Sequence, residues 1–170
     1  MSIQQFNGEW ISQEDRVLFR FNTSTGEEFS FWLTRMVLKG LIQGAQQVSV
    51  QALTQTHAPQ VAQAVQSFQQ QAVAQQANFS DDYKSAPKKP LGDAPLLVIG
   101  LVIHQQDDGQ TAIELQLITQ NSVNLKLPPH VLHIMMTLLN KLQDRAGWGV
   151  GFDDVRPPEL PLVPAAPQVH

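Results

Sequence analysis

A pattern of apolar residues occurs twice in this chain, at a spacing of 94 residues (123 − 29 = 94). In both copies, alternation with a period of two gives way to helical spacing at the same point, as expected for a β-hairpin that leads into a helix. Internal duplication accounts for the match, and the alternative is that two amphipathic hairpin-helix segments align by chance. The aligned pairs are Val17/Thr111, Phe19/Ile113, Phe21/Leu115, Phe29/Val123, Phe31/Leu125, Leu33/Leu127, Val37/Val131, Leu38/Leu132, Leu41/Met135 and Ile42/Met136.

The repeat predicts an α+β fold with an antiparallel sheet, built from a duplicated strand-strand-strand-helix unit. Two further segments follow from composition: an inserted helix rich in Gln and Ala, and a C-terminal tail that contains five prolines and that we expect to be disordered. We expect both repeats to belong to one domain. The predicted boundaries are 1–58 for the first repeat, 59–79 for the inserted helix, 80–95 for a flexible linker, 96–152 for the second repeat and 153–170 for the tail.

The charge and composition suit a folded, soluble protein. The chain has 170 residues, 42% of them hydrophobic, a net charge of −4 and no cysteine. Disulfides and thiolate metal ligands are therefore excluded, and the acidic balance argues mildly against binding nucleic acid through phosphate contacts. We expect a cytoplasmic location, since the N-terminus shows no secretory signal and the longest apolar run is too short to cross a membrane.

No pattern in the chain indicates catalysis, a cofactor or a metal. No serine lies in a Gly-x-Ser-x-Gly elbow, and no glycine-rich phosphate loop follows a strand. His130 and His133 have a spacing that lets two imidazoles meet one metal, but no further ligand is tied to them by spacing. The sequence therefore favours a protein that is not an enzyme, with no catalytic residue, metal site or cofactor.

One face of the first predicted hairpin combines cations with an aromatic ring. Arg16, Arg20 and Trp32 share the side opposite the Phe residues, and Arg35 follows closely. Such a face can bind single-stranded DNA or RNA by phosphate contacts and base stacking, but the favoured interpretation is that Trp32 and Leu18 are covered by the inserted helix or by a second subunit. The tandem layout also resembles, in architecture alone, that of Whirly-like and Pur-type single-strand-binding proteins, which have four strands per unit and basic sheet faces.

The segment Leu96–Ile103 lacks polar alternation, which predicts a strand buried on both faces. One layer of helices covers one face, so the other face needs the inserted helix or a second chain, and a homodimer is the commonest solution. The expected interface residues are Leu97, Ile99, Leu101 and Ile103 on this strand and Val61, Val65 and Phe68 on the inserted helix.

Two glycines four residues apart on the first predicted helix, Gly40 and Gly44, call for a packing reason, because glycine weakens a helix interior by about 1 kcal/mol. They align with Ile134 and Leu138 of the second repeat. We expect this glycine pair to receive Ile134 or Leu138, so that the two repeat helices pack together; the alternative is that the glycines face solvent or the sheet.

These observations favour a non-enzymatic binding or scaffolding protein that self-associates. The alternative function is single-stranded nucleic-acid binding through Arg16, Arg20, Trp32 and Arg35.

Overall fold

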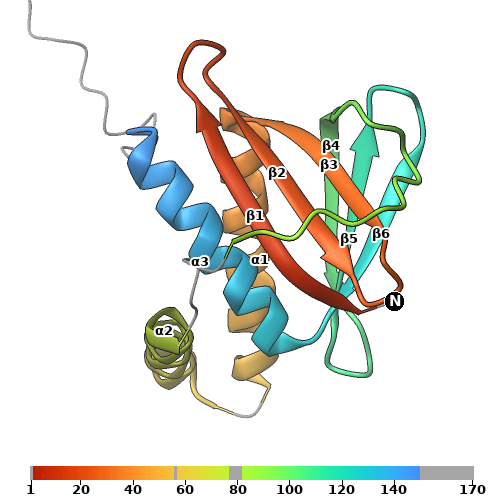
Figure 1. Cartoon of the computed structure of the whole chain (residues 1–170). Coiled ribbons are helices and arrows are strands. Elements are labelled where there is room, and N and C mark those ends of the chain that lie inside the picture. Colours follow the sequence, from red (N-terminus) through yellow and green to blue (C-terminus); the bar gives the residue numbers. More distant parts are fainter. Residues whose placement is uncertain (1, 56, 77–81, 150–170) are drawn as a thin grey trace, which may run out of the picture.

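A computed structural model describes residues 2–55, 57–76 and 82–149 (Figure 1). It contains one six-stranded sheet in the order β1-β2-β3-β4-β5-β6 and three helices. The strands are β1 (Ile3–Ile11), β2 (Arg16–Thr23), β3 (Glu28–Thr34), β4 (Leu96–Gln105), β5 (Thr111–Leu117) and β6 (Ser122–Leu127). The helices are α1 (Arg35–Thr54), α2 (Pro59–Gln76) and α3 (Pro129–Arg145).

The predicted α+β class is confirmed, but the sheet is mixed rather than purely antiparallel. β3 and β4 run parallel, with Phe31 beside Leu96 and Trp32 beside Leu97. The other neighbouring strands pair antiparallel. The connection from β3 to β4 explains the difference: the chain passes through α1 and α2 before it returns to the sheet, and such a crossover permits a parallel neighbour where a short hairpin does not.

The two halves of the sheet pair in the same register. Phe21 lies opposite Phe6 and Phe29 in the first half, and Leu115 lies opposite Leu101 and Val123 in the second half. The spacing is 94 residues in the second and third strands of each half (115 − 21 = 94) and 95 residues in the first strand (101 − 6 = 95), because the paired residues Leu101 and Leu115 are 14 residues apart in the chain, whereas Phe6 and Phe21 are 15 apart.

Irregular features of the strands and turns also recur at these spacings. The register of β1 shifts between Ile3 and Gln5, and that of β4 shifts between Val98 and Gly100. Positive φ angles occur at Asp15 (47°) and Gly109 (79°), and again at Gly26 (75°) and Gln120 (68°). The turn bond from the Gly26 N–H to the Thr23 carbonyl has its counterpart from the Gln120 N–H to the Leu117 carbonyl, at 3.0 Å and 2.9 Å.

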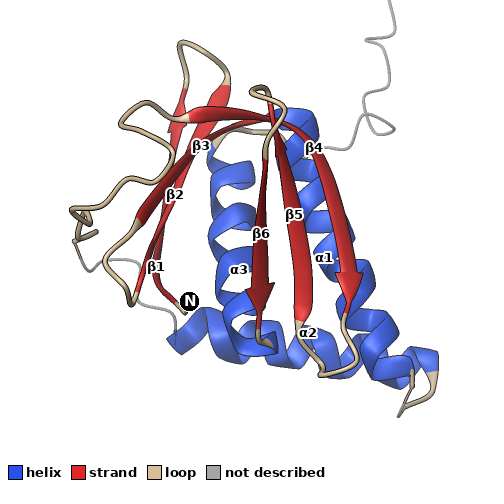
Figure 2. Ribbon diagram, turned by 90° about the vertical axis from the view of Figure 1, so that its right-hand side faces the viewer, coloured by secondary structure: helices blue, strands red, loops and turns tan. Residues whose placement is uncertain are grey.

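The helices bring the two halves together on one face of the sheet (Figure 2). α1 packs against β3 and β4, whereas α3 packs against β6 and β1, so each helix contacts the first strand of the other half. α2 packs against α1 and α3. Buried residues of both halves, among them Phe19, Phe31, Leu115 and Leu132, belong to one core cluster.

The glycine pair of α1 faces the sheet, which corrects the expected packing. A Cβ atom at Gly40 would lie 3.4 Å from Leu101 Cδ1, and one at Gly44 would lie 2.7 Å from Ile103 Cδ1. α1 and α3 do contact each other, but Ile134 and Leu138 are not the nearest neighbours of these glycines. Only Gly44 is required by this packing, because α1 crosses β4 most closely at Ile103, whereas a Cβ at Gly40 would make an ordinary contact with Leu101.

The predicted flexible linker, where it is described, lies on the sheet. Residues 82–90, here called the strap, cross the sheet face opposite the helices (Figure 1). Asn22 Nδ2 donates to the Lys84 carbonyl at 2.7 Å, and the Lys84 N–H donates to Gln5 Oε1 at 3.2 Å. Composition indicated a linker because the strap buries little apolar surface; polar side chains of β1, β2 and β3 hold it instead.

The expected disorder of the tail concerns residues 153–170, which lie outside the described residues.

Candidate functional site

The sheet face opposite α1 and α3, here called the outer face, carries most of the residues that the sequence singled out. Neither α1 nor α3 covers it (Figure 2). The strap crosses its first half, over β1 to β3. The outer face is therefore the surface on which the predicted binding functions can be compared.

Arg16 and Trp32 come together as expected, but they already contact each other. The guanidinium carbon of Arg16 lies 3.7 Å from the centre of the Trp32 ring, and Arg16 also forms an ion pair with Glu14. A cation seated on an indole is itself a favourable contact. One face of the ring is thus occupied, which reduces its use for stacking a base.

The other two arginines have partners of their own. Arg20 Nη2 donates to Asn7 Oδ1 at 2.7 Å, and its guanidinium lies 5.0 Å from the centre of the Tyr83 ring in the strap. Arg35 pairs with Asp15 Oδ2 at 3.1 Å and lies 5.4 Å from the Trp148 ring. The four predicted nucleic-acid-binding residues are therefore engaged at three separate places rather than gathered into one cationic platform.

A row of apolar residues on neighbouring strands crosses the middle of the outer face. Leu18 lies opposite Trp32, Trp32 lies beside Leu97, and the Ile118 N–H donates to the Leu97 carbonyl at 3.0 Å. We call Leu97, Ile99, Val102 and Ile118 the β4 apolar patch. Ile99, Val102 and Ile118 are 59%, 43% and 57% exposed.

The patch contains half of the interface residues that the sequence predicted on β4. The register shift at Ile99 reverses the alternation of the strand, so that Leu101 and Ile103 point to α1 and pack against the core. These two residues are therefore not available to a second chain, which corrects that part of the prediction. Leu97 and Ile99 lie outside the helix-covered side, where a partner can reach them. A β-bulge adds one residue to a strand, so the side chains beyond it point to the opposite face from the one that simple alternation predicts.

The predicted apolar stripe of α2 is not the side that packs. Ala62 and Gln66 are buried at 0% and 3% exposure, and Gln66 Nε2 donates to the Gln46 carbonyl of α1 at 3.3 Å. Val65 is half-buried, while Val61 and Phe68 are 49% and 73% exposed. Val61 and Phe68 thus form a second exposed apolar feature, on the opposite side of the molecule from the outer face.

Buried polar groups hold the strap to the first half of the outer face. The Glu28 carboxylate, which is buried, accepts a hydrogen bond from the Ala86 N–H at 3.2 Å. Burial and the nearby Glu28 carboxylate raise the pKa of the Tyr83 hydroxyl far above its usual value, so Tyr83 stays neutral. These contacts fix the strap on the sheet and have a structural role. No sequence motif indicates them, because Glu28 and Ala86 are 58 residues apart in the chain.

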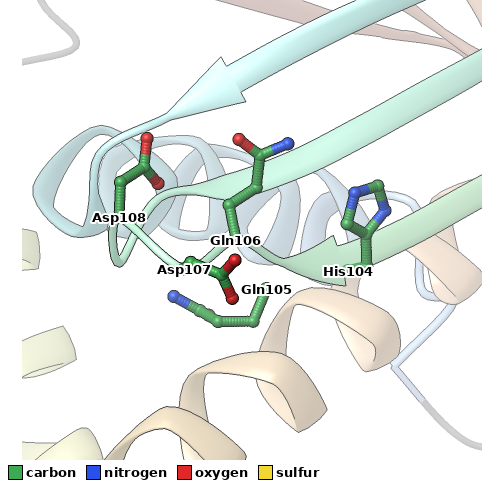
Figure 3. A pocket seen from close by; sticks show the side chains of 5 residues that line it. All are labelled: His104, Gln105, Gln106, Asp107 and Asp108. Atoms are coloured by element: carbon green, nitrogen blue, oxygen red, sulfur yellow. The ribbon is translucent and has the colours of Figure 1, made fainter.

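The end of the β4–β5 hairpin forms a shallow, open hollow lined by His104, Gln105, Gln106, Asp107 and Asp108 (Figure 3). Asp108 has a turn-forming role there: its Oδ1 accepts from the Gln110 N–H at 3.0 Å. Among residues 2–55, 57–76 and 82–149, no group of three or more His, Cys, Asp or Glu side chains is placed to hold a metal ion. The hollow therefore offers no arrangement of catalytic or metal-binding groups.

His133 of α3 is almost fully buried, and burial lowers its pKa below the usual value. His130, three residues earlier, is exposed. The two imidazoles therefore lie in different environments.

No helix within the described ranges has the length and apolar character needed to cross a membrane. No family model matches the chain, and no curated protein or solved structure matches it significantly.

Proposed function

We propose that this chain is a non-enzymatic binding protein that self-associates through the second half of its outer face. The observation that carries the proposal is the β4 apolar patch, Leu97, Ile99, Val102 and Ile118, which continues into the row formed by Trp32 and Leu18. A group of exposed apolar side chains on one face of a folded protein commonly marks an interaction site, and here the Gln116 amide, which lies over Gly100, separates Val102 from the other three.

A second copy of the chain is the partner that this surface fits. The outer-face residues that surround the patch on β5 and β6 include Glu114 and Lys126, one acid and one base. An interface with two-fold symmetry places the same patch on both subunits, so Glu114 of one copy can meet Lys126 of the other. The apolar centre with a mixed-charge rim also matches the usual anatomy of a protein–protein interface.

The duplication predicted from the sequence is part of the same proposal. The common pairing register, the two register shifts, the two pairs of positive φ angles and the helix starts at Arg35 and Pro129 all support a repeated unit. Under this proposal the strap covers the outer face of the first half, and the outer face of the second half serves for binding.

The test is the mass of the protein in solution, measured by sedimentation or light scattering at micromolar concentrations. We expect a monomer–dimer equilibrium. Ile99→Asp should raise the dissociation constant of the dimer at least about tenfold, because a charge at the centre of an interface is strongly unfavourable. Met36→Asp is the matched control, because Met36 is 80% exposed but lies at the start of α1. A monomer throughout, or equal effects of both variants, would refute the proposal.

Single-stranded nucleic-acid binding remains the alternative function. The pairing of Arg16 with Trp32 and Glu14, and of Arg20 with Asn7 and Tyr83, counts against it. A fluorescence titration with single-stranded DNA and RNA at low and moderate salt separates the two functions. Salt-sensitive binding that Arg16→Gln weakens would favour the alternative.

A further inference from the structure

The C-terminal residues resemble the strap in sequence. Asp81-Asp82-Tyr83-Lys84 corresponds to Asp153-Asp154-Val155-Arg156 at a spacing of 72 residues (153 − 81 = 72). Pro87-x-x-Pro90-Leu91 corresponds to Pro158-x-x-Pro161-Leu162 at a spacing of 71 residues (158 − 87 = 71), after a deletion of one residue. Each of the two segments follows one strand-strand-strand-helix unit, and α2 precedes only the first. We call residues 153–162 the tail segment.

The contacts of the strap show how such a segment binds a half of the sheet. Its main chain bonds to side chains of β1 and β2 at Lys84, as described above. At Lys88 it follows the free edge of β3: the Glu28 N–H donates to the Lys88 carbonyl at 2.7 Å, and the Lys88 N–H donates to the Gly26 carbonyl at 3.2 Å. The strap is thus bound largely through its backbone, which tolerates changes of sequence.

The second half offers the matching edge, and nothing in the described part of the chain covers it. Ser122 and Gln120 are the counterparts of Glu28 and Gly26 in the common register. β6 is the last strand of the sheet, so its outer edge has no neighbouring strand among the described residues. The backbone groups that bind Lys88 in the first half are therefore open to the tail segment in the second.

Side chains differ between the two halves in a complementary way. Ala86, whose N–H donates to Glu28, corresponds to Pro157, which has no N–H; and Glu28 itself is replaced by Ser122. The donor and its acceptor are thus absent together.

Charged and polar side chains also differ in a matching way, on the sheet and on the segment that would bind it. Arg20 on the first half is replaced by Glu114 on the second, where the tail segment brings Arg156. The polar Asn7 is replaced by Val102 of the β4 apolar patch, and the tail segment is more apolar than the strap at Val155 and Leu160.

The end of the described chain lies within reach of this surface. Trp148 Nε1 donates to Asp15 Oδ1 at 3.0 Å, and the Trp148 ring lies near Arg35, directly after β3. β4 runs beside the end of β3. The seven residue steps from Gly149 to Arg156 span up to about 24 Å when extended, which is enough to cross two or three strands.

From these observations we propose that the tail segment binds in cis across the second half of the outer face, as the strap binds across the first, and covers the β4 apolar patch. The docking stands independently of the proposed self-association, but its consequence rests on that function: the tail segment competes with the second copy for the same surface. Self-association is then regulated by release of the tail segment.

Disulfide trapping tests the docking cleanly, because the chain has no cysteine. In the full-length protein, the pair Gln116→Cys and Arg156→Cys should form a disulfide within one chain under mild oxidation. Its counterpart in the strap, Asn22→Cys with Lys84→Cys, is the positive control, since the Asn22 side chain donates to the Lys84 carbonyl and so lies beside that residue. Gln43→Cys with Arg156→Cys is the negative control, since Gln43 is exposed on α1.

The proposal predicts a monomeric cross-linked product at a rate near that of the positive control. A rate no higher than that of the negative control refutes the docking, and a cross-link between chains refutes docking in cis. The oxidised and reduced forms of the same protein then test regulation: the intramolecular disulfide should weaken self-association at least about tenfold. If the cross-link forms but a chain that ends at Phe152, without the tail segment, is still a monomer at all concentrations, the proposed function fails while the docking stands.

Discussion

Because α1 packs closely on β4, the effect of Gly44→Ala on the free energy of unfolding can be predicted quantitatively. Alanine is favoured over glycine in a helix by about 1 kcal/mol. A Cβ at Gly44, however, would lie 2.7 Å from Ile103 Cδ1, with Ile103 Cγ1 and Cβ at 3.5 Å and 3.7 Å. Overpacking of this kind costs about 1–3 kcal/mol, so Gly44→Ala should lower the free energy of unfolding by up to about 2 kcal/mol. Gly40→Ala is the matched control, because its Cβ would lie 3.4 Å from Leu101 Cδ1 and the helix should gain about 0.5–1 kcal/mol.

A double-mutant cycle with Ile103→Val isolates the contact. Valine lacks the Cδ1 atom, and the single substitution should cost about 1 kcal/mol. In that background Gly44→Ala should become neutral or stabilising, which gives a coupling energy of about 1–2 kcal/mol. Urea unfolding with linear extrapolation measures all four proteins. If Gly44→Ala stabilises the protein as Gly40→Ala does, or has the same effect in both Ile103 backgrounds, the packing argument fails.

Two further predictions concern α3, which packs against β1. Gly8→Ala should lower the free energy of unfolding by about 2 kcal/mol or more in the same urea assay, because the new Cβ would collide with Leu142 of α3. Gly149→Ala is the control and should change the free energy of unfolding by less than about 0.5 kcal/mol. Equal effects of the two substitutions would contradict the packing of α3 on β1. Because burial holds the pKa of His133 below its value in the unfolded chain, the unfolded state binds the proton more readily, and the stability from neutral His133 should be lost as pH falls through about 6.5. His133→Gln should flatten the pH dependence of unfolding between pH 7 and 5, and an unchanged slope in this variant would refute the role of His133.

The sequence alone determined the local elements and their order. Alternation around Phe19 and Phe31 predicted the first hairpin, which leads into a helix as expected. That helix is capped locally by Thr34, whose Oγ1 accepts from the Val37 N–H at 3.4 Å, and the helix of the second repeat begins at Pro129. These predictions succeeded because period, turn residues and caps reflect interactions between residues close together in the chain.

The tertiary structure alone decided how these elements meet. The parallel pairing of β3 with β4 depends on the path of the chain through α1 and α2, and the inward orientation of Leu101 and Ile103 depends on one extra residue at Ile99. The partner of Gly44 is a strand of the other half rather than a helix.

The strap is a second case in which local sequence patterns do not reveal contacts between distant parts of the chain. Its composition is that of a linker, yet Asn22 and Glu28 bind its backbone from 62 and 58 residues away. An apolar period shows that a face is buried but not which surface buries it, because any apolar surface removes a side chain from water equally well. Contacts made by the backbone leave still less trace in the sequence, since they do not depend on the side chain that is bound.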